Sequence, residues 1–319
     1  MASGYGILGH LGIAKETTWG TAVAATDYFE ALSEGITSVP DRFETKNIVG
    51  NMYEPDDVTG IIRSAGDVSF AAHPTPLGHF LMGALGNNSG SVILSGFLFK
   101  NEFTAKTSDT SSLHPLPAYT FEVFRDIGSS QQFDGAQISQ LQLAVQPNQD
   151  LRATASVIAK TSRNLAKTTP SFPGSPVGVF TFDTCSISLG GTGVSIVEAL
   201  TVTINNQLEG LAALNNSTSI ARIKRSGPPQ IRVAGTIALE DIIEYQKLIN
   251  QTEFALVVNL TKANSFALVI DVPRLVYTGF PLGMGGRGRQ TVSFAATGRY
   301  HTGSSSAIKV SLTNTKSDY

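Results

Sequence analysis

The chain of 319 residues has a single cysteine and few charges, and both shortages narrow what it can be. Cys185 has no partner for a disulfide within the chain, which excludes a small secreted domain held together by disulfides. Charged residues make up 15% of the chain, and the formal net charge is −2. A nearly neutral chain has no overall attraction to phosphate, so tight, salt-sensitive binding of nucleic acid is not expected.

Long apolar runs and export signals are also missing. No stretch approaches the roughly 20 apolar residues that a membrane-spanning helix needs, and the first residues lack a basic segment followed by an apolar core. We therefore expect no membrane-spanning segment and no export by such a signal.

One glycine-rich string imitates a nucleotide-binding motif. Gly283 to Gly288 matches the glycine spacing of dinucleotide-binding loops, but such a loop must lead into a helix. The residues that follow, from Gln290 to Ala295, alternate as a strand does. The string therefore predicts a hairpin between strands near 274–280 and 290–298, with Arg287 and Arg289 forming a basic tip that is available for inter-subunit contacts.

Motifs that would carry catalysis are absent from the sequence. The five histidines lack the spacing of a helical zinc site. No nucleophile elbow, phosphate-binding loop or paired-cysteine cluster occurs. We expect no catalytic residue, no cofactor and no metal, and hence a protein that is not an enzyme.

Most periodic segments alternate between apolar and polar residues, which is typical of strands with one buried face. Leu141, Leu143 and Val145 share one face, for example, and Gln140 and Gln142 share the other. The sequence therefore predicts a mainly β protein.

The second half of the chain resembles the first in the order of its segments. Glu30-Ala-Leu recurs as Glu198-Ala-Leu, and Arg63-Ser recurs as Arg225-Ser. Each half also contains one amphipathic helical segment, near 76–85 and near 242–249. We predict two tandem β-sandwich or partial-barrel domains, each with one flanking helix.

Composition and turn signals place the boundaries. The predicted parts are an N-terminal arm over 1–27, a first domain over 28–172, a second domain over 173–303 and a C-terminal arm over 304–319. The first domain carries an insertion at about 87–117, in which we expect a hairpin. Long polar loops at 38–60 and 206–222 fall at matching places in the two domains, and their length favours a binding role.

The N-terminal string resembles a known family. Gly12-Ile-Ala-Lys-Glu-Thr-Thr-Trp-Gly-Thr-Ala-Val, followed by Tyr28-Phe-Glu-Ala-Leu-Ser-Glu, is similar to the start of tail tube (major tail) proteins of long-tailed, non-contractile bacteriophages. The likeness continues through Arg63-Ser-Ala-Gly-Asp-Val and covers most of the chain.

This resemblance implies a structural virion protein with a tail-tube-like fold. Such proteins polymerise into stacked rings of six domains that form the channel for DNA delivery into the host. With two domains in each chain, three chains would complete a pseudo-sixfold ring. The implied partners are further copies of the chain, the tape measure, tail terminator and distal tail proteins, and phage DNA in transient contact with the lumen. The implied location is the virion tail, after assembly in the host bacterial cytoplasm.

Passage of DNA requires weak contact, so we expect one sheet face per domain, rich in acidic, hydroxyl and amide side chains, to line the lumen. Apolar residues of the arm and loops are candidates for inter-subunit contact, with burial in their own domain as the competing interpretation. These candidates are Trp19, Val23, Ile48, Met52 and Tyr53.

The alternative function is a virion decoration protein or a carbohydrate-binding β-sandwich. Tyr119, Phe121 and Phe124 could then form a sugar platform on a solvent-facing strand, although their alternation suits a core equally well.

Overall fold

The computed structural model describes residues 4–46, 48, 50, 52–53, 56–109, 114–172, 178–262, 265–283 and 288–319. Over these residues the protein is mainly β, with two α-helices and antiparallel sheets that do not close into a barrel. The prediction of a mainly β fold is confirmed. No helix in the described part of the chain has both the length and the apolar character to cross a membrane.

The elements of the first half include the helix α1 and eleven strands. They are η1 Gly6–Leu8, β1 His10–Lys15, β2 Asp27–Phe29, β3 Ala31–Glu34, β4 Thr37–Glu44, β5 Asp57–Ala71, α1 Pro74–Leu85, β6 Gly86–Ser95, β7 Leu98–Ala105, β8 Tyr119–Phe124, β9 Ser130–Val145, β10 Arg152–Ala159 and β11 Thr161–Leu165.

The second half has a shorter helix and ten strands. They are η2 Phe182–Thr184, β12 Cys185–Leu189, β13 Thr192–Val194, β14 Val197–Asn205, β15 Leu208–Leu211, β16 Arg222–Arg225, β17 Gln230–Ala238, α2 Ile243–Ile249, β18 Phe254–Lys262, β19 Phe266–Gly279, β20 Thr291–Gly298 and β21 Lys309–Asn314.

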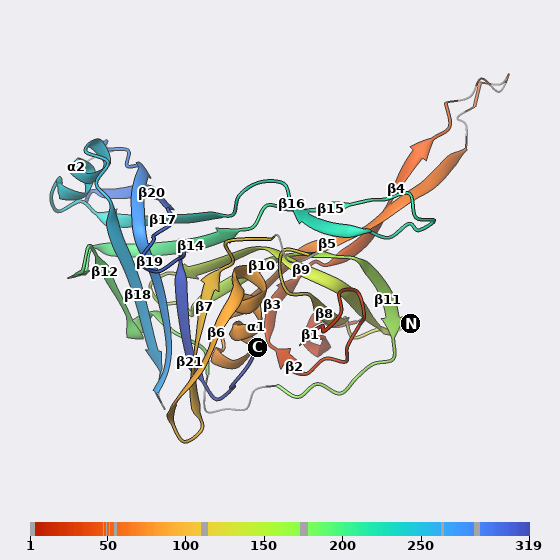
Figure 1. Cartoon of the computed structure of the whole chain (residues 1–319), viewed down its shortest axis with the longest axis horizontal. Coiled ribbons are helices and arrows are strands. Elements are labelled where there is room, and N and C mark those ends of the chain that lie inside the picture. The colour runs from red at the N-terminus through yellow and green to blue at the C-terminus, as the bar shows by residue number, and fades with distance from the viewer. Residues whose placement is uncertain are drawn as a thin grey trace.

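One continuous antiparallel sheet, which we call the central sheet, joins the two halves. Its order is β3 with β4, then β5, β10, β9, β14, β17, β20 and β19. Its members from β5 to β17 lie side by side in Figure 1, with α1 beneath them. The two halves meet where β9 pairs with β14, from Gln140 opposite Asn205 to Val145 opposite Leu200.

A second set of strands packs below the central sheet in each half. In the first half the order is β2, β1, β8, the start of β9 and β11. In the second half it is β13, β12, β18, the start of β19 and β21, with β7 and β6 added beyond β21. One apolar core runs between these layers through both halves and includes Phe70, Phe80, Phe121 and Phe133.

The two halves therefore pair their strands in the same order, and their irregularities coincide. A register shift lies between Ala31 and Ser33 in β3, and another lies between Val197 and Ala199 in β14. Shifts also fall at Tyr119–Phe121 in β8 and at Phe254–Leu256 in β18. The pairing sets Ala31 against Val197, so the alignment of the Glu-Ala-Leu strings was two residues out of register. The division into the predicted domains and arms stays a prediction.

The helix predicted in the first half is present as α1, and its first-turn proline and C-terminal glycine lie where they were predicted. Prolines occupy the first turn of α1, where their missing N–H costs nothing. His73 caps the start, and Gly86 ends the helix with φ +83°, a conformation that favours glycine. The helix of the second half, α2, is also present, and its Asp241 carboxylate accepts a hydrogen bond from the Ile243 N–H at 2.9 Å.

Two regions that were predicted as polar loops contain paired strands. The region 38–60 is largely a hairpin, because β4 pairs with β5 as far as Glu44 opposite Asp57. The region 206–222 contains β15 and the first residue of β16, which form a separate two-stranded sheet. Residues 10–15 and 309–314, predicted within terminal arms, pair with strands of their own chain. The hairpin expected in the predicted insertion is present as β6 and β7.

Candidate assembly surfaces

The outer face of the central sheet carries rows of polar side chains, most of which are uncharged. These side chains alternate with buried ones such as Ala153 and Leu143, and they lie directly opposite one another across the strands. One row consists of Ser69, Thr154, Gln142, Thr203, Arg232 and Thr297. A second row consists of Asp67, Ser156, Gln140, Asn205 and Gln230.

The rows continue from the first half into the second, and the side chains on both sides of the junction are polar. Gln142 of β9 lies opposite Thr203 of β14, and the Ser69 and Thr154 hydroxyls are 2.9 Å apart. The basic groups on this face have partners nearby. Arg152 lies 3.8 Å from Asp150, and Arg232 donates a hydrogen bond of 2.6 Å to Gln230 Oε1. The sheet therefore presents a surface that can contact a polyanion at few points.

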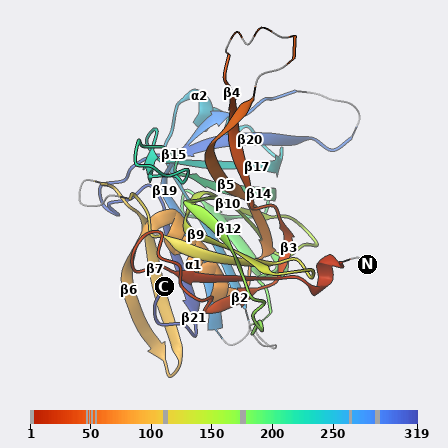
Figure 2. The ribbon, with the colours of Figure 1, turned by 90° about the vertical axis from the view of Figure 1, so that its right-hand side faces the viewer.

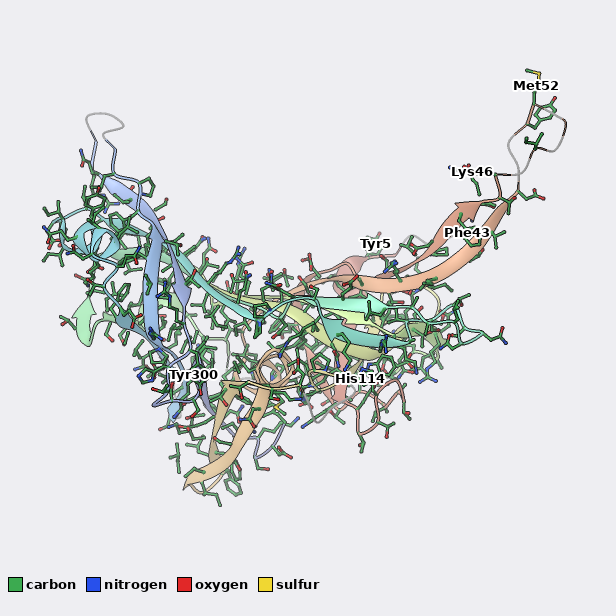
Figure 3. The ribbon with its side chains drawn as sticks, turned by 45° about the horizontal axis from the view of Figure 1, so that its top comes forward. Tyr5, Phe43, Lys46, Met52, His114 and Tyr300 are labelled. Carbon is green, nitrogen blue, oxygen red and sulfur yellow. The ribbon has the colours of Figure 1, made fainter. Side chains whose placement is uncertain are left out.

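The β4–β5 hairpin projects from the body of the molecule (Figures 1 and 3). Two exposed ion pairs connect its strands. Arg42 Nη1 lies 2.9 Å from Asp57 Oδ2, and Arg63 Nε lies 2.9 Å from Asp41 Oδ2. In Figure 3 Phe43 and Lys46 lie along the hairpin and Met52 lies at its far end.

Three predicted contact residues lie at the tip of this hairpin. Ile48 and Met52 are fully exposed, and Tyr53 is 85% exposed. A group of large, exposed apolar side chains at the end of a projecting element is typical of an interaction surface.

The other two apolar candidates lie against their own chain. The Trp19 indole N–H donates to the Gly135 carbonyl at 3.0 Å, and its ring stacks on His114 at 3.9 Å between centroids. The Val23 N–H donates to Thr120 Oγ1 at 3.1 Å. Both side chains are half-buried, as the competing interpretation expects.

Of the two arginines predicted at the basic hairpin tip, Arg289 lies within the described residues. Arg289 pairs with Glu198 of the same chain. Arg287 lies outside the described residues. The strands on both sides of this tip, β19 and β20, are antiparallel neighbours, which confirms the predicted hairpin and not a nucleotide-binding loop.

The hairpin predicted in the insertion also has an exposed apolar tip, which was not among the predicted contact surfaces. The β6–β7 hairpin points away from β4–β5 (Figure 2) and exposes Val92, Ile93, Leu94 and Phe97. Its signal was present as two short apolar runs around a turn, but a run of apolar residues does not say whether they lie in a core or in solvent.

The edge of the central sheet at β3 and β4 is closed by side chains. The Ile36 N–H donates to Glu34 Oε1 at 2.5 Å, and the Ile36 carbonyl accepts from Arg125 Nη2 at 2.8 Å. Arg125 and Glu34 also form an ion pair of 2.8 Å. These two side chains thus occupy the place that a neighbouring strand would take.

The aromatic residues considered for a sugar platform are buried. Tyr119, Phe121 and Phe124 of β8 are 0%, 0% and 3% exposed, because both faces of this strand are covered. That part of the alternative is wrong.

Other reactive groups do not assemble into a site in the described part of the chain. No group of three or more histidine, cysteine or acidic side chains there could hold a metal ion. Burial raises the pKa of the half-buried Cys185 thiol, which disfavours its reactive thiolate form.

Comparison with known proteins assigns the chain to a family. The model of the phage tail tube protein family matches residues 6–298, which include both helices and every strand except β21. No curated protein has a significantly similar sequence. The family places the protein in the virion tail as a structural component. On this match, and with a β-rich fold that agrees with it, the chain belongs to the phage tail tube protein family.

Proposed function

We propose that three copies of this chain form a ring and that stacked rings make a tube through which phage DNA passes. Each chain would supply two tube domains, so that six domains encircle the channel. The observation that carries this proposal is the matched strand order of the two halves, joined edge to edge by β9 and β14. A side-by-side pair of like modules is what a ring with pseudo-sixfold symmetry requires from each of three subunits.

The outer face of the central sheet is the proposed channel lining. Duplex DNA carries about one charge per 1.7 Å of its axis, so a strongly basic lining would hold it at many phosphates. Rows made mostly of glutamine, serine, threonine and asparagine, such as Gln142 beside Thr203, offer weak contacts. Contact with the DNA would therefore be transient and independent of base sequence.

The β4–β5 hairpin is the proposed contact between rings. Its exposed tip residues Ile48, Met52 and Tyr53 would become buried against the neighbouring ring. At the two ends of the tube the same surfaces would meet other tail proteins, for which the tail terminator and the distal tail protein are the candidates. The tape measure protein would lie inside the channel before DNA enters.

A tube wall acts through its shape, its interfaces and the charge of its lining. The proposal accordingly gives the chain no catalytic step, no cofactor and no metal.

Electron microscopy of the purified protein tests the proposal. We expect hollow tubes whose rings each contain three chains with six similar domains around the channel. Rings of six chains would overturn the trimer, and separate globules under all assembly conditions would overturn the tube and favour a decoration protein.

A further inference from the structure

We propose that the β3–β4 edge of one chain pairs with the end of β19 in the next chain, in the same register that joins the two halves within a chain. The inference rests on the proposed self-assembly and names the surfaces that carry it out. Its partner is a second copy of this chain.

The junction within the chain supplies the template. There β14 pairs with the end of β9, with Val202 opposite Leu143 and Thr203 opposite Gln142. Any strand pair that occupies the equivalent positions at the outer ends of the chain can repeat this junction.

The counterpart of β14 is the segment 31–39. Its register shift between Ala31 and Ser33 matches the shift between Val197 and Ala199 of β14. Beyond it, Ser38 lies opposite Ser64 of β5, as Ile204 lies opposite Ile231 of β17. By this register Ile36 corresponds to Val202, and Thr37 corresponds to Thr203.

The counterpart of the end of β9 is the segment 279–283. β9 has a register shift opposite Ser156 and Val157 of β10, and β19 has one between Tyr277 and Gly279. Aligning the two shifts makes Pro281 the counterpart of Gln142, and Leu282 the counterpart of Leu143.

Within the described residues, both outer segments lack the neighbouring strand that their counterparts have. Residues 141–144 form a strand between β10 and β14. The described residues 280–283 are not part of a strand, and β19 ends at Gly279. Within the described residues β3 and β4 pair with strand β5 alone. A strand from another copy would therefore complete both edges at once.

The resulting register satisfies the backbone. The Gly35 N–H donates to the Asp67 carbonyl of β5 at 2.9 Å, so the N–H and C=O of the next residue, Ile36, point outward. Ile36 would then exchange hydrogen bonds with Leu282. Pro281 would face Thr37 at a position whose backbone groups point toward β20, so its missing N–H costs no bond between chains.

The side-chain cap explains why this edge does not pair prematurely. Glu34 and Arg125 occupy the outward N–H and C=O of Ile36 in the free chain. The counterpart of Glu34 is Leu200, and that edge is open to β9. Capping of exposed strand edges by charged side chains is a common protection against unwanted pairing, and docking of the next chain would displace the cap.

Because the two edges differ, the contact is head to tail, and a head-to-tail contact closes into a ring when its rotation divides the circle. Each ring would then contain alternating junctions of the two kinds, one within chains and one between chains, built on one pattern of strand pairing.

Paired cysteines test the register. The variant Thr37→Cys with Pro281→Cys, in a chain whose Cys185 is replaced by serine, should form disulfides between chains when assembled tubes are oxidised, giving dimers and trimers on non-reducing electrophoresis. Opposite residues that do not exchange hydrogen bonds have the closest side chains, so this pair suits a disulfide. The matched control is Thr203→Cys with Gln142→Cys, which should close within one chain. Thr37→Cys with Ser293→Cys, one strand further in, should not cross-link.

The outcomes separate this inference from the tube itself. Tubes in which the control pair closes and the Thr37–Pro281 pair does not would overturn the pairing and leave the tube intact. Failure of the unmodified chain to form any tube would overturn both. A cross-linked ladder that ends at six chains would support the pairing and overturn the trimer.

If the cysteine pair itself prevents assembly under reducing conditions, a second variant tests the pairing instead. Glu34→Ala removes half of the cap, and a hydrogen bond to a charged group is worth about 1.5 kcal/mol, so assembly should begin at a roughly tenfold lower protein concentration. An unchanged or higher concentration would overturn the pairing at this edge.

Discussion

At the scale of single residues, a largely buried cluster ties the segment that follows β21 to β2 and α1. Lys316 Nζ lies 2.6 Å from Asp27 Oδ2, and His79 Nε2 lies 3.0 Å from the same oxygen. The Tyr319 hydroxyl donates to the Thr75 carbonyl at 2.8 Å, and its ring fills the space beside Gly78, where any larger side chain would collide with it. Residues far apart in the sequence thus depend on one another.

This cluster makes stability depend on pH. Burial lowers the pKa of His79, although Asp27 acts to raise it. Burial alone would raise the pKa of Asp27, but the hydrogen bonds from His79 and Lys316 outweigh it and lower that pKa. Both shifts favour the forms present at neutral pH, so each contribution is lost as the pH falls, below about 6.5 for His79 and below about 3.9 for Asp27.

We expect the melting temperature to fall as the pH is lowered from 7 to 5, because the unfolded chain binds a proton at His79 more readily than the folded chain does. His79→Gln should flatten this slope, because glutamine does not titrate. Thermal unfolding followed by circular dichroism at several pH values measures it, with His301→Gln, in a surface turn, as the matched control. A slope that stays the same in His79→Gln would contradict the assignment.

At the scale of elements, the projecting part of the β4–β5 hairpin lies outside the core. Its strands are held by exposed ion pairs, and its tip residues contribute little to the buried interior. Changes at the tip should therefore alter assembly without altering folding.

The variant Ile48→Asp with Met52→Asp should change the free energy of unfolding by less than about 1 kcal/mol, because each exposed substitution usually changes it by about 0.5 kcal/mol or less. Stacking of rings should fail, since buried charges without partners are costly at an interface. Tube length in electron micrographs and melting temperature are the two measurements. Ile242→Asp, an exposed apolar residue at the start of α2, is the control, and long tubes from the tip variant would refute the contact between rings.

Sequence signals predicted some elements well and others poorly, for physical reasons. α1 was predictable because first-turn prolines and Gly86 are local signals. The β4–β5 hairpin was predicted as a loop because both of its faces meet solvent, so no apolar stripe marks it. The pairing of β1 with β8 and of β21 with β19 and β7 joins distant segments, and alternation alone does not say which strands will meet.

Some residues of the candidate surfaces could also be predicted from the sequence, and others could not. Ile48, Met52 and Tyr53 could be selected from sequence because large apolar residues stood in a polar region. The cap on Ile36 could not, because Glu34 and Arg125 are brought together by the fold alone. The exposure of the β6–β7 tip also needed the structure, since its apolar runs resemble those of a core strand.

At the scale of the whole molecule, the proposed lining predicts how charge would affect DNA. Gln140→Lys, Gln142→Lys and Thr203→Lys place three basic groups on adjacent strands of the outer face. Tubes of this variant should retain DNA, with the logarithm of the binding constant falling by about 0.9 per contacted phosphate for each unit of log salt.

Retention of DNA by assembled tubes at 50–200 mM salt, a range over which such contacts weaken strongly, measures the effect. Thr17→Lys, Thr18→Lys and Thr21→Lys add the same charge at exposed sites outside the central sheet and serve as the control. Equal retention by the two variants would place the channel on another face.

The covalent link between the halves has an entropic consequence. Bringing two free bodies together costs on the order of 4–15 kcal/mol in translational and rotational freedom. The β9–β14 contact avoids that cost because peptide bonds already hold its two sides close together. In a three-chain ring only every second seam would then have to recruit its partner from solution, so growth of the polymer would be limited by the seams between separate molecules.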